Sequence, residues 1–151
     1  MAFSNGEPFA TGLADYTYHS PTPRELEPRL ILQIAFEGFE AAAILDTGAP
    51  YVICAPAVAR QVGFAPTGSL GQIRLLVRGA SVSGRLYRST VTFPAILGVD
   101  LSVDATVFVP DPDWEESWGD LPSFIGLGGC LERMRFAIDP GSDTFYFGPL
   151  A

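Results

Sequence analysis

An aspartate directly follows an apolar run within Ile44–Ala49 (ILDTGA), and this stretch limits the possible folds more than any other. Residues 30–45 alternate in a pattern that predicts a β-hairpin with its turn near Glu37-Gly38, so the second strand delivers Asp46 from a hydrophobic core. Burying an unpaired carboxylate costs several kcal/mol, and Gly48 permits a turn in which backbone N–H groups face the acid. An ordinary turn aspartate bonded to its own backbone is the other interpretation.

The remaining chain consists of short apolar runs separated by turn residues. With 13 Pro and 16 Gly among 151 residues, this spacing predicts an all-β barrel or sandwich rather than a helical bundle. Residues 55–63 are the exception, because Pro56 suits a first helical position and Gly63 suits a helix end. A second short helical pattern covers residues 130–134. We therefore expect an all-β fold with one or two short helices.

Two predicted strands, Gln72–Val77 and Arg85–Ile96, flank the small residues of Arg78–Gly84. Such a pattern predicts a β-hairpin with a small-residue tip. The hairpin either bends over a cleft or is a plain surface hairpin. Further along, Leu101–Val109 alternates as another strand.

The N-terminal residues 1–28 are rich in Pro, Gly, Ser and Thr and show no period. They predict an extended N-terminal arm, followed by a single domain over residues 29–151. The sequence has neither a basic start with an apolar signal segment nor a run of about 18 apolar residues, so we expect a cytoplasmic protein that does not enter a membrane. Cys54 and Cys130 are expected to be reduced and buried.

Several function classes are disfavoured by composition. The formal net charge of -8 argues against nucleic-acid binding, which needs a basic face. The chain has no lysine for a phosphate-binding loop, and a single histidine, His19, gives poor support for a Ser-His-Asp, Cys-His or multi-histidine metal site. The acidic residues of 110–120 lack the calcium-loop pattern and predict a solvated loop. We expect no metal and no cofactor.

A second informative stretch is Leu121–Gly129, which contains Phe124-Ile125-Gly126. Its glycines do not complete a dinucleotide-binding pattern, because position 131 is leucine. An apolar pair followed by glycine instead predicts a strand that passes close to another backbone. The order of a hairpin ending in D-T-G-A, a second hairpin, and this F-I-G element resembles that of a retropepsin-like, single-lobe aspartic protease. The resemblance covers residues 29–148.

The resemblance implies a closed, retropepsin-like acid-protease β-barrel with a flap hairpin. It implies that Asp46 is the catalytic aspartate, that Thr47 braces the two active-site loops and that Gly48 lies beside the substrate. The residues implied to support the active-site loop are Thr47, Gly48, Ala49, Phe124, Ile125 and Gly126. The residues implied to form the flap are Gly79, Ala80, Ser81, Val82, Ser83 and Gly84, a tip with fewer glycines than the flaps of retroviral enzymes.

This family hydrolyses peptide bonds with two carboxylates that share one proton. Because the chain has one D-T-G, the second aspartate is expected from a second copy, which makes the enzyme a homodimer. A peptide or protein substrate is expected to bind as an added strand. Two other functions stay open: a non-catalytic peptide-binding or dimerisation module on the same fold, and a glycoside hydrolase, which needs another acid at a fixed distance from Asp46.

Overall fold

The computed structural model describes residues 2–150, which are mostly β-strands, and it confirms the predicted all-β class. One predicted helix forms at α1, residues 131–133 form only a short 3₁₀ helix, and the second α-helix lies within the stretch 110–120 that was predicted to be a solvated loop. The strands are β1 Gly12–Asp15, β2 Thr17–His19, β3 Arg29–Phe36, β4 Phe39–Asp46, β5 Val52–Ile53, β6 Gly71–Val77, β7 Ala80–Phe93, β8 Leu97–Gly98, β9 Leu101–Pro110, β10 Ser123–Gly126, β11 Met134–Asp139 and β12 Thr144–Pro149. The helices are α1 Pro56–Val62 and α2 Glu115–Trp118, with short 3₁₀ helices η1 Pro66–Gly68, η2 Pro112–Trp114 and η3 Leu131–Arg133.

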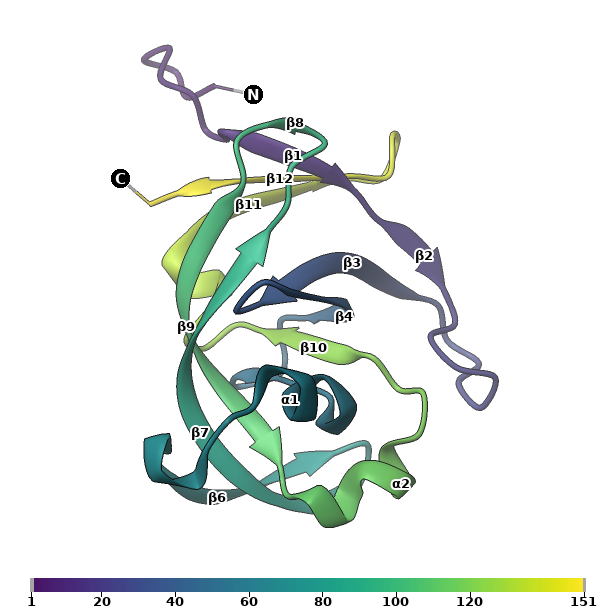
Figure 1. Ribbon diagram of the computed structural model, residues 1–151. Helices are drawn as coiled ribbons and strands as arrows, with labels where there is room; N and C mark the ends of the chain where they lie inside the picture. The colour runs from purple at the N-terminus through teal and green to yellow at the C-terminus, as the bar shows by residue number, and fades with distance from the viewer. Residues whose placement is uncertain (1, 151) are drawn as a thin grey trace.

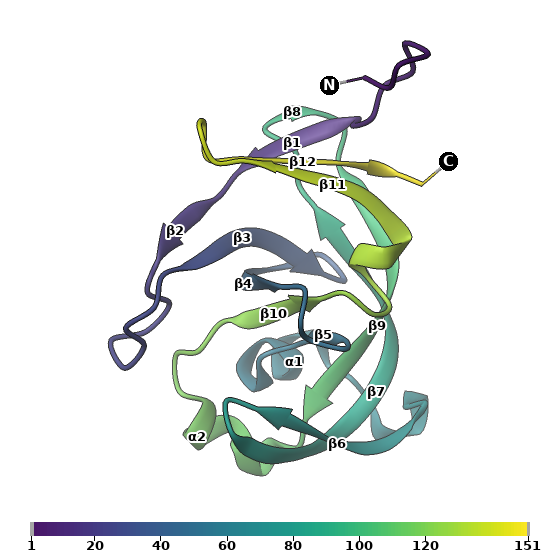
Figure 2. The same cartoon turned by 180° about the vertical axis from the view of Figure 1, so that it is seen from behind.

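The strands form two sheets. One has the order β11-β12-β1-β8, and the other has the order β2-β3-β4-β10-β5-β9-β7-β6. β3 also pairs with β7, at Ala35↔Thr92 and Phe36↔Val91, so the pairings that run from β3 through β4, β10, β5, β9 and β7 return to β3. Figures 1 and 2 place the four-stranded sheet at one end of the molecule and β6 at the other. Because this series of strand pairings closes on itself, few strand edges are left unpaired and open to other chains.

The hairpin that carries Asp46 forms as predicted. β3 and β4 pair from Ile31↔Ile44 to Phe36↔Phe39. The two turn residues, Glu37 and Gly38, have φ of 46° and 87°, which is the positive-φ geometry of a tight two-residue hairpin turn. A turn of fixed length sets the register of the hairpin. The position of Asp46 at the end of β4 follows from that register.

Helix α1 also forms where it was predicted. Pro56 occupies its first turn, where a missing N–H costs nothing. Gly63 ends it in the left-handed conformation at φ 82°, with its N–H bonded to the Ala59 carbonyl oxygen at 2.9 Å.

The β6–β7 hairpin corrects the prediction for its tip. The turn contains only Arg78 and Gly79, at φ 52° and 82°, and Val77 pairs with Ala80 directly beside them. Residues 80–84 belong to β7, so their interpretation as a loop was wrong. The glycine at position 84 has a packing cause, because a Cβ there would lie 2.3 Å from the carbonyl oxygen of Val109 in β9. Glycine therefore allows this close crossing of two strands.

The N-terminal arm contributes strands to both sheets. β1 lies between β12 and β8, with Gly12 opposite both Phe147 and Gly98. β2 extends the larger sheet by pairing with β3, from Thr17↔Ile31 to His19↔Arg29. Neither strand is evident from the sequence, because both are short, and β12, one of the partners of β1, lies at the far end of the chain. Residues 20–28 connect the arm to β3 outside any strand.

Two groups of buried side chains fill the molecule. The larger one packs between the sheets and includes Phe93, Phe145 and Phe147, whose ring centres lie 6.0 to 6.1 Å apart. The smaller one includes Phe108 and Phe124 and lies against the β6–β7 hairpin through Val82 and neighbouring side chains. None of the helices in residues 2–150 has the length and apolar composition that crossing a bilayer would take.

Cys54 and Cys130 are free and buried, as predicted. Burial raises the pKa of each thiol from 9.0 to about 12, because a thiolate is poorly solvated inside the core. We expect iodoacetamide at mildly alkaline pH to label both thiols about 100-fold more slowly in the folded protein than in urea. Between pH 9 and 12 the unfolded chain loses these protons first, so the free energy of unfolding should fall as pH rises through that window. Equal labelling rates would contradict the burial of the thiols.

Candidate active site

Asp46 ends β4 in a turn held by backbone hydrogen bonds. The Gly48 N–H donates to Asp46 Oδ1 at 3.0 Å, and the Ala49 N–H donates to the Asp46 carbonyl oxygen at 3.0 Å. The Asp46 side chain is 31% exposed. One carboxylate oxygen is thus fixed by the backbone, while the group as a whole stays accessible to a ligand.

Strand β10 supports this turn from between β4 and β5 (Figure 2). It runs parallel to β4, with Gly126 opposite Asp46, and antiparallel to β5, with Phe124 opposite Ile53. Parallel pairing of β10 with β4 brings the ends of both strands to the same place. Residues far apart in the sequence therefore meet at the Asp46 turn.

Gly126 makes the close backbone approach that its sequence context predicted. A Cβ at this position would lie 2.0 Å from the Tyr51 carbonyl oxygen and 2.8 Å from the Ala49 carbonyl oxygen. Directly after it, the Leu127 N–H donates to the Ala49 carbonyl oxygen at 3.0 Å. The chain that follows Asp46 is consequently held against the end of β10.

The other predicted site residues divide into exposed and buried ones. Thr47 and Gly48 are exposed on the turn, whereas Ala49 is buried. Phe124 and Ile125 are 2% and 0% exposed, so their side chains belong to the core beside the turn. The structure brings all of these residues together, and their catalytic or supporting roles stay predictions.

A cleft of about 280 Å³ separates the Asp46 turn from the β6–β7 hairpin. One wall consists of residues from the turn, β5 and β10, namely Asp46, Gly48, Ala49, Pro50, Ile53 and Phe124. The facing wall consists of residues from the end of β6 and the hairpin tip, namely Leu75, Leu76, Val77 and Arg78.

The lining of this cleft differs from the predicted flap. Within the described chain, residues 79–84 are not part of the lining. Val82 instead points into the core, where it is 2% exposed. The flap role of residues 79–84 stays a prediction. The cleft is lined instead by β6, through Leu75, Leu76 and Val77.

A chain of charged side chains connects Asp46 to the hairpin tip. Arg29 Nη2 lies 3.5 Å from Asp46 Oδ2, and Arg29 Nη1 lies 3.8 Å from Glu25 Oε1. The same Glu25 oxygen forms an ion pair with Arg78 Nη1. The Arg78 guanidinium also lies 5.2 Å from the centre of the Phe124 ring. Nothing in the sequence marks Glu25 or Arg29 as a site residue, because neither belongs to a motif.

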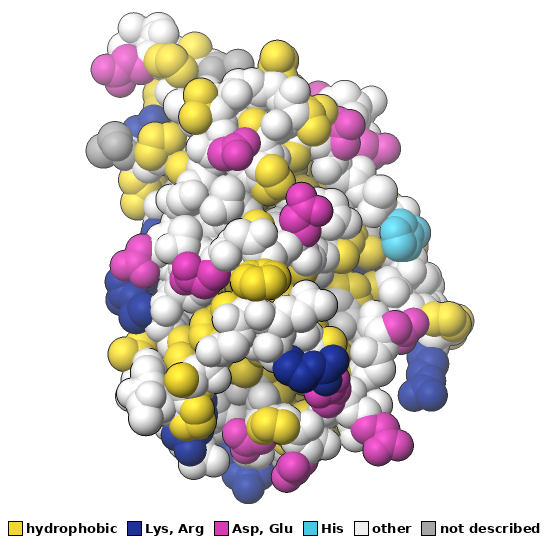
Figure 3. Space-filling model, viewed as in Figure 1, with side chains coloured by type: hydrophobic (Ala, Val, Ile, Leu, Met, Phe, Trp, Pro, Cys, Tyr) yellow, Lys and Arg dark blue, Asp and Glu magenta, His cyan; other side chains and the backbone are white. Residues whose placement is uncertain are grey.

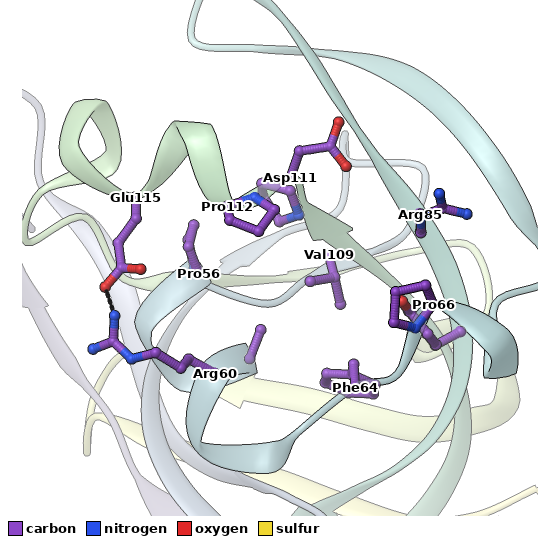
Figure 4. Close-up of a pocket in the computed structure, with 12 residues that line it drawn as sticks. Pro56, Arg60, Phe64, Pro66, Arg85, Val109, Asp111, Pro112 and Glu115 are labelled. Carbon is purple, nitrogen blue, oxygen red and sulfur yellow. Dashed lines mark hydrogen bonds and ion pairs between the residues drawn. The ribbon is translucent and has the colours of Figure 1, made fainter.

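A separate pocket of about 250 Å³ shares no lining residue with the Asp46 cleft (Figure 4). Its walls are mainly apolar, with Pro56, Phe64 and Val109 among them, and an ion pair between Arg60 and Glu115 closes one side. Nothing in this pocket reaches Asp46. It carries no part of the candidate active site.

Metal binding and glycoside hydrolysis each need a particular set of side chains. Residues 2–150 contain no group of three or more His, Cys, Asp or Glu side chains placed to hold a metal ion. Asp46 is the single acid among the described residues that line its cleft, so one chain does not offer the second carboxylate that a glycoside hydrolase needs. On the face shown in Figure 3, acidic side chains are scattered among basic ones rather than gathered into one patch.

Comparison with known proteins gives structural matches only. No protein-family model matches the sequence, and no curated protein matches it. A crystal structure of a retropepsin-like aspartic protease from Rickettsia conorii is similar with a TM-score of 0.53 and 18% sequence identity, over 91% of this chain and 95% of that one. The retroviral protease-like domain of Ddi1 from Leishmania major overlaps less well, with a TM-score of 0.48 and 17% identity over 80% of this chain and 94% of that domain.

The first of these similarities extends over nearly the whole of both chains. The chain therefore has the retropepsin-like fold.

Proposed function

We propose that this protein is an aspartic endopeptidase, active as a homodimer in which Asp46 of each chain supplies one carboxylate. The observation that carries the proposal is the setting of Asp46. It is a backbone-anchored, partly exposed acid that lines a cleft facing a β-hairpin, in a chain with the retropepsin-like fold.

The chemistry requires two carboxylates that hold one proton between them. One accepts a proton from the attacking water while the other donates a proton to the carbonyl oxygen of the scissile peptide bond. A two-fold axis places the same residue on both sides of a site. Thr47 and Gly48 are exposed on the turn of the single chain, so they are available to face the same turn in a second copy.

An extended peptide suits the cleft as a substrate. Its walls offer apolar side chains such as Leu75 and Ile53 together with the backbone of the Asp46 turn. Peptides bind such surfaces by adding a strand and placing alternate side chains in pockets. The mechanism uses water and two carboxylates, so it calls for no cofactor. A cytoplasmic location stays a prediction from the sequence.

Peptide cleavage per chain should rise with protein concentration and then level off as the dimer saturates, because a single chain holds only half of the acid pair. The test measures cleavage of a fluorogenic peptide library over a dilution series, with sedimentation of the same samples. Cleavage that follows the fraction of dimer supports the proposal. A specific activity that stays constant where the protein sediments as a monomer would contradict it.

A non-catalytic peptide-binding or dimerisation module is the second candidate. One observation favours it: Arg29 Nη2 lies 3.5 Å from Asp46 Oδ2, so this acid has an ion-pair partner within the single chain. If no concentration in the dilution series shows cleavage, while labelled peptides bind the protein in a separate fluorescence-anisotropy titration, the chain is better explained as a non-catalytic module.

A further inference from the structure

Glu25 lies between two arginines at the end of the Asp46 cleft. Its Oε1 atom forms ion pairs with Arg78 at the hairpin tip and with Arg29 beside Asp46. We propose that Arg78, assisted by Arg29, binds an acidic side chain of the peptide in the cleft, and that Glu25 occupies this position while the cleft is empty. The inference rests on the proposed function only in taking the Asp46 cleft as a peptide-binding cleft.

Arg78 lies between two neighbouring cavities and lines both of them. It lines the cleft that contains Asp46, and it also lines a neighbouring cavity of about 480 Å³ between residues 22–25 and residues 116–121. Glu25 lines the second cavity as well. An extended peptide advances about 3.3 Å per residue, so a peptide that continues out of the Asp46 cleft toward the second cavity meets Arg78 within a few residues.

Glu25 uses only one of its two carboxylate oxygens in its ion pairs with Arg29 and Arg78. Both ion pairs use its Oε1 atom, while its Oε2 atom is buried and has no hydrogen-bond partner among the described residues. A guanidinium binds a carboxylate best through two parallel N–H···O bonds, and a buried oxygen left unpaired is unfavourable. A ligand carboxylate that uses both oxygens therefore has an advantage over Glu25.

The segment that carries Glu25 is free to move without breaking a sheet. Residues 20–28 lie outside any strand, and the β2–β3 ladder ends at His19↔Arg29. Leu26, next to Glu25, is 91% exposed, so displacing the segment removes no leucine from the core. The side chains of Arg29 and Arg78 are 30% and 32% exposed, which leaves both within reach of a ligand.

The net charge of the protein opposes binding of an acidic peptide. A measured preference for such a peptide would therefore point to the arginines in the cleft. The chain carries a formal net charge of -8, so long-range electrostatics repel an acidic peptide. A peptide that binds better with glutamate than with glutamine must gain from local arginines. Arg74 offers a matched control, because it is an exposed arginine on β6 of the same hairpin but does not line the cleft.

The experiment measures binding in an Asp46→Asn background, so that cleavage does not interfere. The probes are two fluorescein-labelled octapeptides with the same apolar centre, one flanked by glutamates and the other by glutamines, followed by fluorescence anisotropy at neutral pH. We expect the glutamate peptide to bind about tenfold more tightly. Glu25→Gln should tighten binding of the glutamate peptide by a further factor of about ten, because the neutral amide competes less well than a carboxylate for Arg78, and should leave binding of the glutamine peptide unchanged.

Arg78→Gln should remove the preference, Arg78→Lys should restore part of it, and Arg74→Gln should leave it intact, with thermal melts showing that each variant is folded. The proposal is overturned if Glu25→Gln does not favour the glutamate peptide, if Arg74→Gln acts like Arg78→Gln, or if neither peptide binds. If the glutamate peptide binds preferentially but the unmodified protein does not cleave peptides, the endopeptidase function is refuted and the binding site at Arg78 is supported. If the protein cleaves peptides without this preference, the endopeptidase function is supported and the binding site at Arg78 is refuted.

Discussion

Replacing Asp46 with asparagine is expected to abolish peptide cleavage by the purified protein. The amide neither ionises nor passes a proton between water and the peptide carbonyl, and the substitution changes both members of the pair in a homodimer. Losing one acid–base group alone lowers rates by about 10²–10⁴-fold. Cleavage of the fluorogenic library should therefore fall at least that far.

The fold should survive this substitution. Asparagine keeps a side-chain oxygen that accepts the Gly48 N–H, which now bonds Asp46 Oδ1 at 3.0 Å. The lost ion pair with Arg29 spans 3.5 Å and involves side chains that are 30% and 31% exposed, so it contributes about 0–1 kcal/mol. Asp104→Asn is the matched control, because it removes another carboxylate that pairs with an arginine, Arg88, outside the cleft. The control should cleave normally.

Mixing the two proteins tests whether one site uses two chains. With a ninefold excess of Asp46→Asn chains, only about one tenth of the unmodified chains find an unmodified partner, so cleavage per unmodified chain should fall about tenfold. A pair with one aspartate and one asparagine lacks the second acid and stays inactive. Cleavage that the excess leaves unchanged would show that each chain acts alone, and full activity of purified Asp46→Asn would refute the assignment.

The parts of the fold that sequence predicted well are those encoded by local patterns. The β3–β4 hairpin has a two-residue turn at Glu37-Gly38 whose positive φ values suit it. α1 begins at Pro56 and ends at Gly63 for equally local reasons. Asp46 and Gly126 were singled out separately, and the structure pairs them across parallel strands. Local chemistry therefore located both halves of the candidate site.

What the sequence did not reveal depends on contacts between distant segments. Gly84 was interpreted as part of a loop, although its lack of a side chain serves the crossing of β7 over β9. Glu25 and Arg29 reach Asp46 and Arg78 only after β2 has paired with β3 and the β6–β7 hairpin has folded over the cleft. No periodic pattern or motif within residues 20–29 predicts these contacts. The proposed binding of an acidic peptide side chain therefore depends on residues that only the structure reveals.

Gly126→Ala is expected to destabilise the fold strongly, because the added Cβ would lie 2.0 Å from the Tyr51 carbonyl oxygen. The neighbour is backbone on the turn that follows Asp46, so relieving the clash requires β10 to move away from β4 and β5. Overpacking of this kind costs about 3 kcal/mol or more. Urea unfolding should show the loss through tryptophan fluorescence, since Trp118 packs edge-on against Phe124 of β10 with ring centres 6.1 Å apart.

Gly68→Ala is the matched control for this experiment. A Cβ at Gly68 would meet nothing within 4 Å, so its effect on the free energy of unfolding should stay within about 1 kcal/mol and is expected to be neutral or stabilising. Any Gly126→Ala protein that still folds should also cleave poorly, because Gly126 lies opposite Asp46 in the β4–β10 ladder. Equal urea midpoints for the two variants would contradict the prediction. They would show that the Asp46 turn does not depend on close packing against β10 and that this packing does not require glycine at position 126.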